Sequence, residues 1–211
     1  MARAVYDASA ERYVEFVGTA ISDRTEAAVD RAMLGAFVEL VRATGGGQVA
    51  DVGCGPGRVA AYLREHGLDA IGVDPSGAML AEARRAHAGI EFVEGSLDAL
   101  PVPAGSLAGA VCWYSIIYTR PDRLGTGFAE LRRVLVPGGH LLLAFQAGDG
   151  TGVHLADAHG TGLPLTSYRH ACADVVERLG LAGFVVHGTA ERTEQLSHES
   201  TPQAFVIARS S

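Results

Sequence analysis

The chain has 211 residues, of which 48% are hydrophobic and 19% are charged. This length and composition are typical of one folded globular domain, and they exclude an intrinsically disordered chain. The formal net charge is −7, and all 17 basic residues are arginines, with no cluster of them along one helix. Because an acidic surface repels phosphate backbones, we expect a small-molecule partner and no nucleic acid.

The cysteines and the apolar runs indicate the cellular compartment. Cys54, Cys112 and Cys172 lie far apart and have no metal-ligand spacing. A sparse, odd set favours free thiols in a reducing compartment, so we predict neither disulfides nor a metal site. No apolar run approaches the roughly 18 residues that cross a bilayer, and the first residues lack the apolar core of a signal peptide. We therefore expect a cytoplasmic protein without a membrane partner, and leave its oligomeric state, a homodimer included, open.

In chain order, residues 1–44 are expected to be mostly helical and to form a lid or cap. The pattern predicts a short helix over 10–17 and a longer one over 25–44, where apolar residues recur at helical spacing. Three consecutive glycines at 45–47 end the second helix.

Residues 48–146 alternate between predicted strands and predicted helices. The strands are expected at 48–52, 69–74, 90–94, 107–113 and 140–145, and the helices at 58–66, 76–88 and 122–135. Repeated alternation with apolar strands is typical of a parallel sheet covered on both faces. We expect this segment to be the cofactor-binding core.

The C-terminal third has a different pattern. Residues 147–166 are rich in Gly, Thr and His and have little periodicity, which predicts a long substrate-side loop or partly ordered lid. Residues 167–211 are predicted to contain a helix at 170–179 and strands at 183–189 and 203–208. Because the composition never shifts enough to mark a boundary, we expect residues 1–211 to form a single domain.

The strongest functional signal is the loop Asp51-Val-Gly-Cys-Gly-Pro-Gly57 after the first predicted strand. In a doubly wound sheet this loop faces the ligand crevice, and glycines let its backbone turn sharply and approach a ligand closely. Asp74 ends the second predicted strand about 20 residues later, where a carboxylate accepts hydrogen bonds from ribose hydroxyls. The spacing predicts a cofactor that carries a ribose.

A nicotinamide-dependent oxidoreductase is the main alternative at this point. Its fingerprint is G-x-G-x-x-G, whereas here glycines occupy alternate positions and Pro56 fixes φ at the start of the helix. Asp51 would repel a pyrophosphate, but it suits a cofactor with an ammonium group and a sulfonium. This comparison favours S-adenosylmethionine. A non-catalytic module that binds the cofactor and regulates a partner stays open as a third alternative.

Three segments resemble class I S-adenosylmethionine-dependent methyltransferases of the small-molecule type. They are the glycine loop, Val73-Asp-Pro-Ser76 with Met79, and Glu130-Leu-Arg-Arg-Val-Leu-Val-Pro-Gly-Gly139. The resemblance covers nearly the whole chain. It implies an α/β, Rossmann-like, doubly wound sheet of seven strands in the order 3-2-1-4-5-7-6, with strand 7 antiparallel and lid helices at the N-terminus. The implied reaction is in-line transfer of a methyl group to an O or N atom of a small molecule.

The resemblance also implies which residues bind the cofactor. The full set is Tyr6, Tyr13, Asp51, Gly53, Cys54, Gly55, Asp74, Pro75, Ser76, Met79, Gly95, Ser96, Leu97, Trp113, Tyr114 and Ser115. Within it, the glycine loop would hold the methionine portion and Asp74 the ribose. Many relatives carry Asp where this chain has Ser96, so a carboxylate contact to the adenine amino group is lost, or replaced by the Ser96 hydroxyl and the Leu97 backbone.

The catalytic prediction is independent of the cofactor set. A base is needed only if the acceptor must lose a proton, and histidine has a suitable pKa for this role. His154, His159 and His198 are the candidates, and we favour His154 because it lies nearest to the exit of the fifth predicted strand. Tyr118, which follows the fourth predicted strand, is expected to orient the acceptor.

Overall fold

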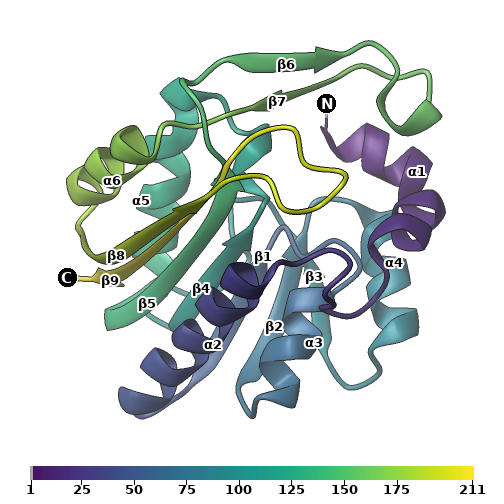
Figure 1. The fold of residues 1–211 in the computed structure, drawn as a ribbon. Coiled ribbons are helices and arrows are strands. Elements are labelled where there is room, and N and C mark those ends of the chain that lie inside the picture. The colour runs from purple at the N-terminus through teal and green to yellow at the C-terminus, as the bar shows by residue number, and fades with distance from the viewer. Residues whose placement is uncertain (1) are drawn as a thin grey trace.

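A seven-stranded sheet forms the centre of the protein in the computed structural model, which describes residues 2–211 (Figure 1). Its strand order is β3-β2-β1-β4-β5-β9-β8. The strands are β1 (Gln48–Val52), β2 (Asp69–Asp74), β3 (Glu91–Glu94), β4 (Leu107–Trp113), β5 (Leu135–Gln146), β8 (Phe184–Arg192) and β9 (Gln203–Ser210). β9 runs antiparallel to β5 and β8, whereas β1 to β5 pair in parallel. The predicted order is confirmed, because β8 and β9 are the sixth and seventh strands of this sheet.

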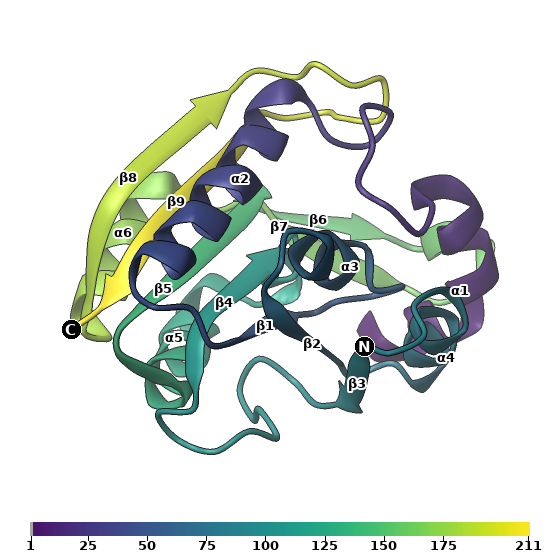
Figure 2. The same cartoon turned by 90° about the horizontal axis from the view of Figure 1, so that it is seen from below.

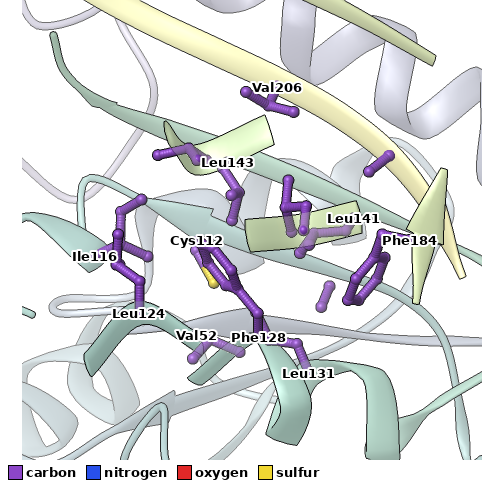
Figure 3. Close-up of a cluster of buried hydrophobic side chains, with 14 of the residues drawn as sticks. Val52, Cys112, Ile116, Leu124, Phe128, Leu131, Leu141, Leu143, Phe184 and Val206 are labelled. Atoms are coloured by element: carbon purple, nitrogen blue, oxygen red, sulfur yellow. The ribbon is translucent and has the colours of Figure 1, made fainter. Parts of the chain in front are cut away.

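Helices cover both faces of the sheet. α2 (Ala28–Ala43), α3 (Arg58–Glu65) and α4 (Gly77–Ala86) lie on one side, and α5 (Leu124–Val134) and α6 (Cys172–Leu181) lie on the other (Figures 1 and 2). The central strand β4 is buried along its whole length and apolar toward both layers, as expected for an internal parallel strand. On the α5 side, Cys112, Phe128 and Leu143 belong to the cluster that Figure 3 shows between strand and helix.

The N-terminal helix is longer than the sequence predicts. α1 spans Ala2–Val17, whereas the pattern predicts only 10–17. Only four of its residues are buried, so the apolar stripe that marks a helix in the sequence is weak. Contacts with α4 complete the helix: Asp7 accepts hydrogen bonds from the Ser76 hydroxyl and the Ala78 backbone, at the N-terminus of α4.

Residues 147–166, predicted as a long loop, contain a β-strand and a short 3-10 helix, which corrects that prediction. β6 (Gly152–Leu155) pairs antiparallel with β7 (Leu165–Tyr168), and η3 (Ala158–Gly160) lies between them. Neither strand has the apolar alternation of a half-buried strand, because the hairpin stands apart from the main sheet. Its apolar anchor is tertiary: buried Ala158 and Leu165 pack against Val5 of α1.

The other predicted boundaries agree with the structure to within a few residues, apart from the start of β5. The Pro137-Gly-Gly139 segment, predicted as a turn before a strand at 140–145, lies inside β5. There the register against β4 shifts between Leu107 and Gly109. Within residues 2–211, we find no helix with the length and apolar character needed to cross a membrane.

Candidate active site

A cavity of about 600 Å³ opens where β1, β2 and β4 end. Its floor is the glycine loop, and its walls come from α1, η3, the segment after β4 and the loop before β9. In an open α/β sheet, ligands bind at this carboxyl edge, and this volume is typical of a small-molecule site.

The glycine loop keeps the floor of the cavity close to its walls. Gly53 has φ +77°, and a Cβ atom there would lie 2.3 Å from the Cβ of Ser115. Gly55 is also in the left-handed region, but a Cβ there would meet only the Tyr13 ring, at 4.0 Å. Gly53 is therefore required for the approach of the segment after β4, whereas Gly55 presents bare backbone to the cavity.

Asp74, the last residue of β2, holds the glycine loop in place from the opposite side of the cavity floor. Its carboxylate accepts a hydrogen bond from the Gly55 backbone N–H and another from the Ser76 backbone N–H, both at 2.8 Å. Asp74 lines the cavity, and burial raises its pKa. Each carboxylate oxygen has a second acceptor position, so Asp74 can bind ligand hydroxyls without releasing the loop.

Asp51 and Cys54 lie behind the floor and outside the cavity wall, which corrects the expectation that the Asp51 carboxylate faces a cofactor. Asp51 is 1% exposed and accepts a hydrogen bond from the backbone N–H of Ala60, in the first turn of α3, at 3.0 Å. Gly57 precedes α3 and has no side chain to cap it, so Asp51 does so from within the core. Burial raises the pKa of Asp51 to about 7. Cys54 instead packs in an apolar cluster with Phe92.

The other predicted cofactor residues converge on the cavity. Its wall contains Tyr6, Tyr13, Gly53, Gly55, Asp74, Pro75, Ser76, Met79, Gly95, Ser96, Leu97, Trp113, Tyr114 and Ser115. Trp113 Nε1 and Ser115 Oγ are buried without a hydrogen-bond partner within residues 2–211. Two unpaired polar groups in one cavity wall are consistent with a polar ligand, and direct contact of these residues with the cofactor stays a prediction.

The sequence interpretation missed a carboxylate next to Ser96. Asp98 also lines the cavity, and it accepts a hydrogen bond from the Ser96 hydroxyl at 2.7 Å. A carboxylate therefore lies in this part of the cavity wall although Ser96 itself carries none. The sequence signal for this contact was the spacing of two residues between Ser96 and Asp98, just after β3. Alternate residues of a turn can lie on the same side of the chain.

The structure corrects the prediction that His154 is the base. His154 is exposed on β6, its Nδ1 lies 3.1 Å from the Thr166 hydroxyl, and it is not part of the cavity wall. None of the β6 residues lines the cavity. His159, five residues later on η3, does line the cavity, as do His198 and the predicted orienting residue Tyr118.

Two ion-pair clusters beside the cavity were also missed. Arg58 lies 2.7 Å from the carboxylate of Glu26, and both residues line the cavity. Arg192 lies 2.6 Å from both Asp30 and Glu199, and these three side chains are almost fully buried. Arg192 therefore joins the start of α2 to the loop that carries His198. Arg58–Glu26 and Arg192–Asp30 join residues 32 and 162 positions apart, and no sequence spacing signals such pairs.

Comparison with known proteins agrees with this geometry. Residues 49–139 match the family model described as a methyltransferase domain. The matched residues include the glycine loop, Asp74 and strands β1 to β4, which form the floor of the cavity. Over this part of its length the chain is similar to the methyltransferase family, as the sequence predicts.

Curated methyltransferases resemble this chain over part of their length. A malonyl-[acyl-carrier protein] O-methyltransferase from Enterobacter lignolyticus is 35% identical over 102 residues, which are 48% of this chain and 40% of that protein. A demethylmenaquinone methyltransferase from Beutenbergia cavernae is 31% identical over 116 residues, covering 55% of this chain and 48% of the relative. The matched regions thus span less than half of either relative.

Solved structures extend the similarity of fold to the whole chain. The magnesium protoporphyrin IX methyltransferase of Synechocystis PCC 6803, solved with bound S-adenosylmethionine, has a TM-score of 0.72 at 19% identity and covers 100% of this chain and 95% of its own. The [4+2]-cyclase SpnF has a TM-score of 0.74 at 18% identity and covers 99% and 94%. These levels of identity show a shared fold, and the cyclase illustrates that the fold alone does not determine the reaction.

Proposed function

We propose that this protein is an S-adenosylmethionine-dependent methyltransferase that methylates an O or N atom of a small molecule. One observation supports it above the others. Asp74, bonded to the Gly55 backbone, stands in the wall of a cavity whose floor is bare glycine backbone. A cofactor with ribose hydroxyls and a slim cationic chain fits this arrangement of acceptor and floor.

The chain's own residues suit the parts of such a cofactor. When bound, S-adenosylmethionine supplies a methyl group on a sulfonium, which leaves as a neutral thioether. Asp74 would accept hydrogen bonds from the ribose, and Met79 and Leu97 offer apolar contact to the adenine. Asp98, bonded to Ser96, would accept a hydrogen bond from the adenine amino group. Displacement at a sulfonium needs chiefly alignment and a dry site, and the enclosed wall provides both.

The acceptor and the compartment follow from weaker but consistent observations. The relatives named above are methyltransferases for malonyl-[acyl-carrier protein] and for demethylmenaquinone, so acyl and ring acceptors both occur among them. The acidic net charge of −7 argues against nucleic acid. The three cysteines are free, and two of them are buried, as expected for the cytoplasm, the compartment we propose.

Calorimetry with S-adenosylhomocysteine and with NAD tests the proposal directly. We expect S-adenosylhomocysteine to bind and NAD not to bind. Asp74→Ala should weaken the first interaction by about 1–3 kcal/mol, the cost of ligand hydroxyls left unpaired. Asp69→Ala, on the exposed first residue of the same strand, is the matched control and should bind normally.

Each other outcome has a defined meaning. Binding of NAD without S-adenosylhomocysteine would overturn the methyltransferase proposal in favour of an oxidoreductase. Binding of S-adenosylhomocysteine, without transfer of a labelled methyl group to any of a broad set of acceptors, would favour a non-catalytic module or another reaction on the same fold. Unchanged affinity in Asp74→Ala would remove Asp74 from the site.

A further inference from the structure

We propose that the acceptor is a planar phenol and that His159 removes its hydroxyl proton during methyl transfer. This inference rests on the proposed methyltransferase function. It concerns the outer half of the cavity, between α1 and the β6–β7 hairpin, which lie side by side in Figures 1 and 2.

Aromatic rings form this outer half of the cavity. They belong to Tyr6, Tyr13, Phe16, Tyr118, His159 and His198. The Tyr6 ring centroid lies 5.2 Å from that of Tyr13 and 5.6 Å from that of Tyr118, in edge-to-face geometry. The His159 ring lies 5.7 Å from Tyr6 and 6.1 Å from Tyr13. Such a wall suits a flat aromatic ligand, which gains both apolar area and ring contacts.

His159 is held in place by a fixed turn. Its backbone lies in the left-handed region at φ 54°, which is rare for a residue other than glycine. The residue before it, Ala158, is fully buried against Val5 and Leu165, and the His159 carbonyl accepts a hydrogen bond from Arg12. Strained backbone persists where the surroundings fix it, and it occurs often at functional sites.

The charges around His159 favour its neutral form. His159 is partly exposed; desolvation by its neighbours and then the nearby Arg12 guanidinium lower its pKa, which favours the neutral imidazole that can accept a proton. Besides Arg12, α1 presents Tyr6 and Tyr13 to it, η1 (Ile116–Tyr118) contributes Tyr118, and Asp157 precedes it on η3. No hydrogen bond is formed by its ring within residues 2–211, so both nitrogens are available.

The neighbouring tyrosines cannot replace His159 as the base. Burial raises the pKa of Tyr6 and of Tyr118, so both hydroxyls keep their protons near neutral pH. The two hydroxyls are hydrogen-bonded to each other. One of them keeps a free hydrogen in that arrangement, which can be donated to an acceptor oxygen. The pair therefore orients the acceptor, as predicted for Tyr118 and in place of the cofactor contact predicted for Tyr6, and His159 takes the proton.

The acidity of the acceptor decides which hydroxyl fits this base. A phenol has a pKa of about 10, within a few units of a histidine, whereas an alcohol is closer to water at about 15.7. A carboxylate acceptor needs no base and is attracted by free cations. Three of the four arginines in the cavity wall, Arg3, Arg58 and Arg120, are already ion-paired with carboxylates of the chain. Arg123 alone of these four has no ion pair within residues 2–211, so the wall offers few free cations to a carboxylate, and a phenol also matches the base.

The proposed step balances without a further reactant. The phenolic oxygen forms a bond to the methyl carbon while the carbon–sulfur bond of the donor breaks, and the electron pair of that bond stays on sulfur. The phenolic proton passes to a ring nitrogen of His159. The imidazolium then releases this proton to water, which restores the neutral base for the next turnover.

The test compares two histidines of the same hairpin with matched acceptors. His159→Asn removes the base but keeps a residue that tolerates the left-handed region, and His154→Asn makes the same change outside the cavity. The acceptors are 1-naphthol, catechol, 1-naphthalenemethanol and 1-naphthoate, with methylated products detected by mass spectrometry. Calorimetry with S-adenosylhomocysteine accompanies each variant.

We expect methyl ethers from the two phenols. His159→Asn should lower kcat by on the order of 100-fold or more. In the wild type, kcat should rise with pH through the pKa of His159, which lies below the usual histidine value, and this acidic limb should disappear in the variant. His154→Asn should change neither quantity. His159→Gly, which relieves the backbone strain, should lose kcat as well although it stays folded.

Several results would overturn the inference. They are unchanged kcat and pH profile in His159→Asn, methylation of the alcohol or the carboxylate in preference to the phenols, and no methylation of any of the four compounds. In each of these cases binding of S-adenosylhomocysteine would leave the cofactor assignment standing. Failure of that binding would instead refute the proposed function itself.

Discussion

The floor of the cavity and its outer wall are built in different ways. The floor, from Asp51 to Gly57 with Asp74, depends on backbone conformation and on carboxylates that bond to nearby N–H groups. The outer wall, from α1, η3 and the loop before β9, depends on side chains that meet from distant parts of the chain. The comparison teaches that local backbone geometry forms the floor, where we propose that the cofactor binds, whereas long-range packing shapes the wall that we propose for the acceptor.

Breaking the Arg192 cluster should have the largest effect on stability. Arg192→Met leaves Asp30 and Glu199 buried without their cation, which costs about 3–5 kcal/mol for a pair of this kind. The measurement is urea unfolding at pH 7. Arg64→Met is the matched control because the Arg64–Asp69 pair is exposed, and it should cost less than about 1 kcal/mol. Equal losses in the two variants would show that the cluster does not anchor the outer wall.

A substitution at Gly53, in the floor of the cavity, should lower the stability nearly as much. Gly53→Ala imposes a left-handed alanine, at about 1–2 kcal/mol, and its Cβ would overlap Ser115, at about 1–3 kcal/mol more. We expect this loss in urea unfolding, together with loss of S-adenosylhomocysteine binding. Gly89→Ala has φ +90° but open space around its Cβ, so it should show only the smaller, conformational part. Retained binding in Gly53→Ala would mean that the loop can move apart from Ser115.

Of these two variants, Gly53→Ala alters a loop that the sequence predicts, and Arg192→Met alters a cluster that it does not predict. The glycine loop and Asp74 were predicted because glycines and strand-end acids lie within short stretches, and the sheet order was implied by the resemblance to the methyltransferases. The hairpin at 152–168 was not predicted, and His154 was preferred over His159, because the packing of Ala158 against Val5, more than a hundred residues away, leaves no local signal. Asp51 was found, but its role was misjudged, because sequence does not show whether a strand-end carboxylate points at a ligand or at its own helix.

The pH dependence of stability tests the revised role of Asp51. Its folded pKa of about 7 lies above its usual value of 3.8, so its contribution is fully present below about pH 4 and is lost as pH rises through 7. We expect the free energy of unfolding to fall between pH 4 and 8 by on the order of 2–4 kcal/mol more in the wild type than in Asp51→Asn. Unfolding by urea across this range measures the difference.

The pH range from 4 to 8 separates the titration of Asp51 from that of Glu199, the other acid whose pKa is strongly shifted. Although burial alone would raise it, hydrogen bonds from Arg192, Gln195 and Leu196 lower the pKa of Glu199 to about 2. Its contribution is therefore lost as pH falls through 2, outside the range measured for Asp51. Asp23→Asn, at an exposed position, is the control and should follow the wild type. If Asp51→Asn also followed it, Asp51 would be charged at every pH and would face solvent or ligand instead of α3.

The smallest expected effect tests whether the outer wall opens as a unit. Val5 is fully buried and is the α1 partner of Ala158 and Leu165, so Val5→Ala should cost about 1–2 kcal/mol of packing between helix and hairpin. Hydrogen exchange should become faster in residues 2–17 and 152–168 and stay unchanged in β1 and β4, because local opening is limited to elements that share this contact. Val185→Ala, at a side chain that is 58% exposed, should alter neither region. Uniformly faster exchange throughout the sheet would instead mean that helix and hairpin unfold only together with the floor, and the two walls of the cavity would then be one cooperative structure.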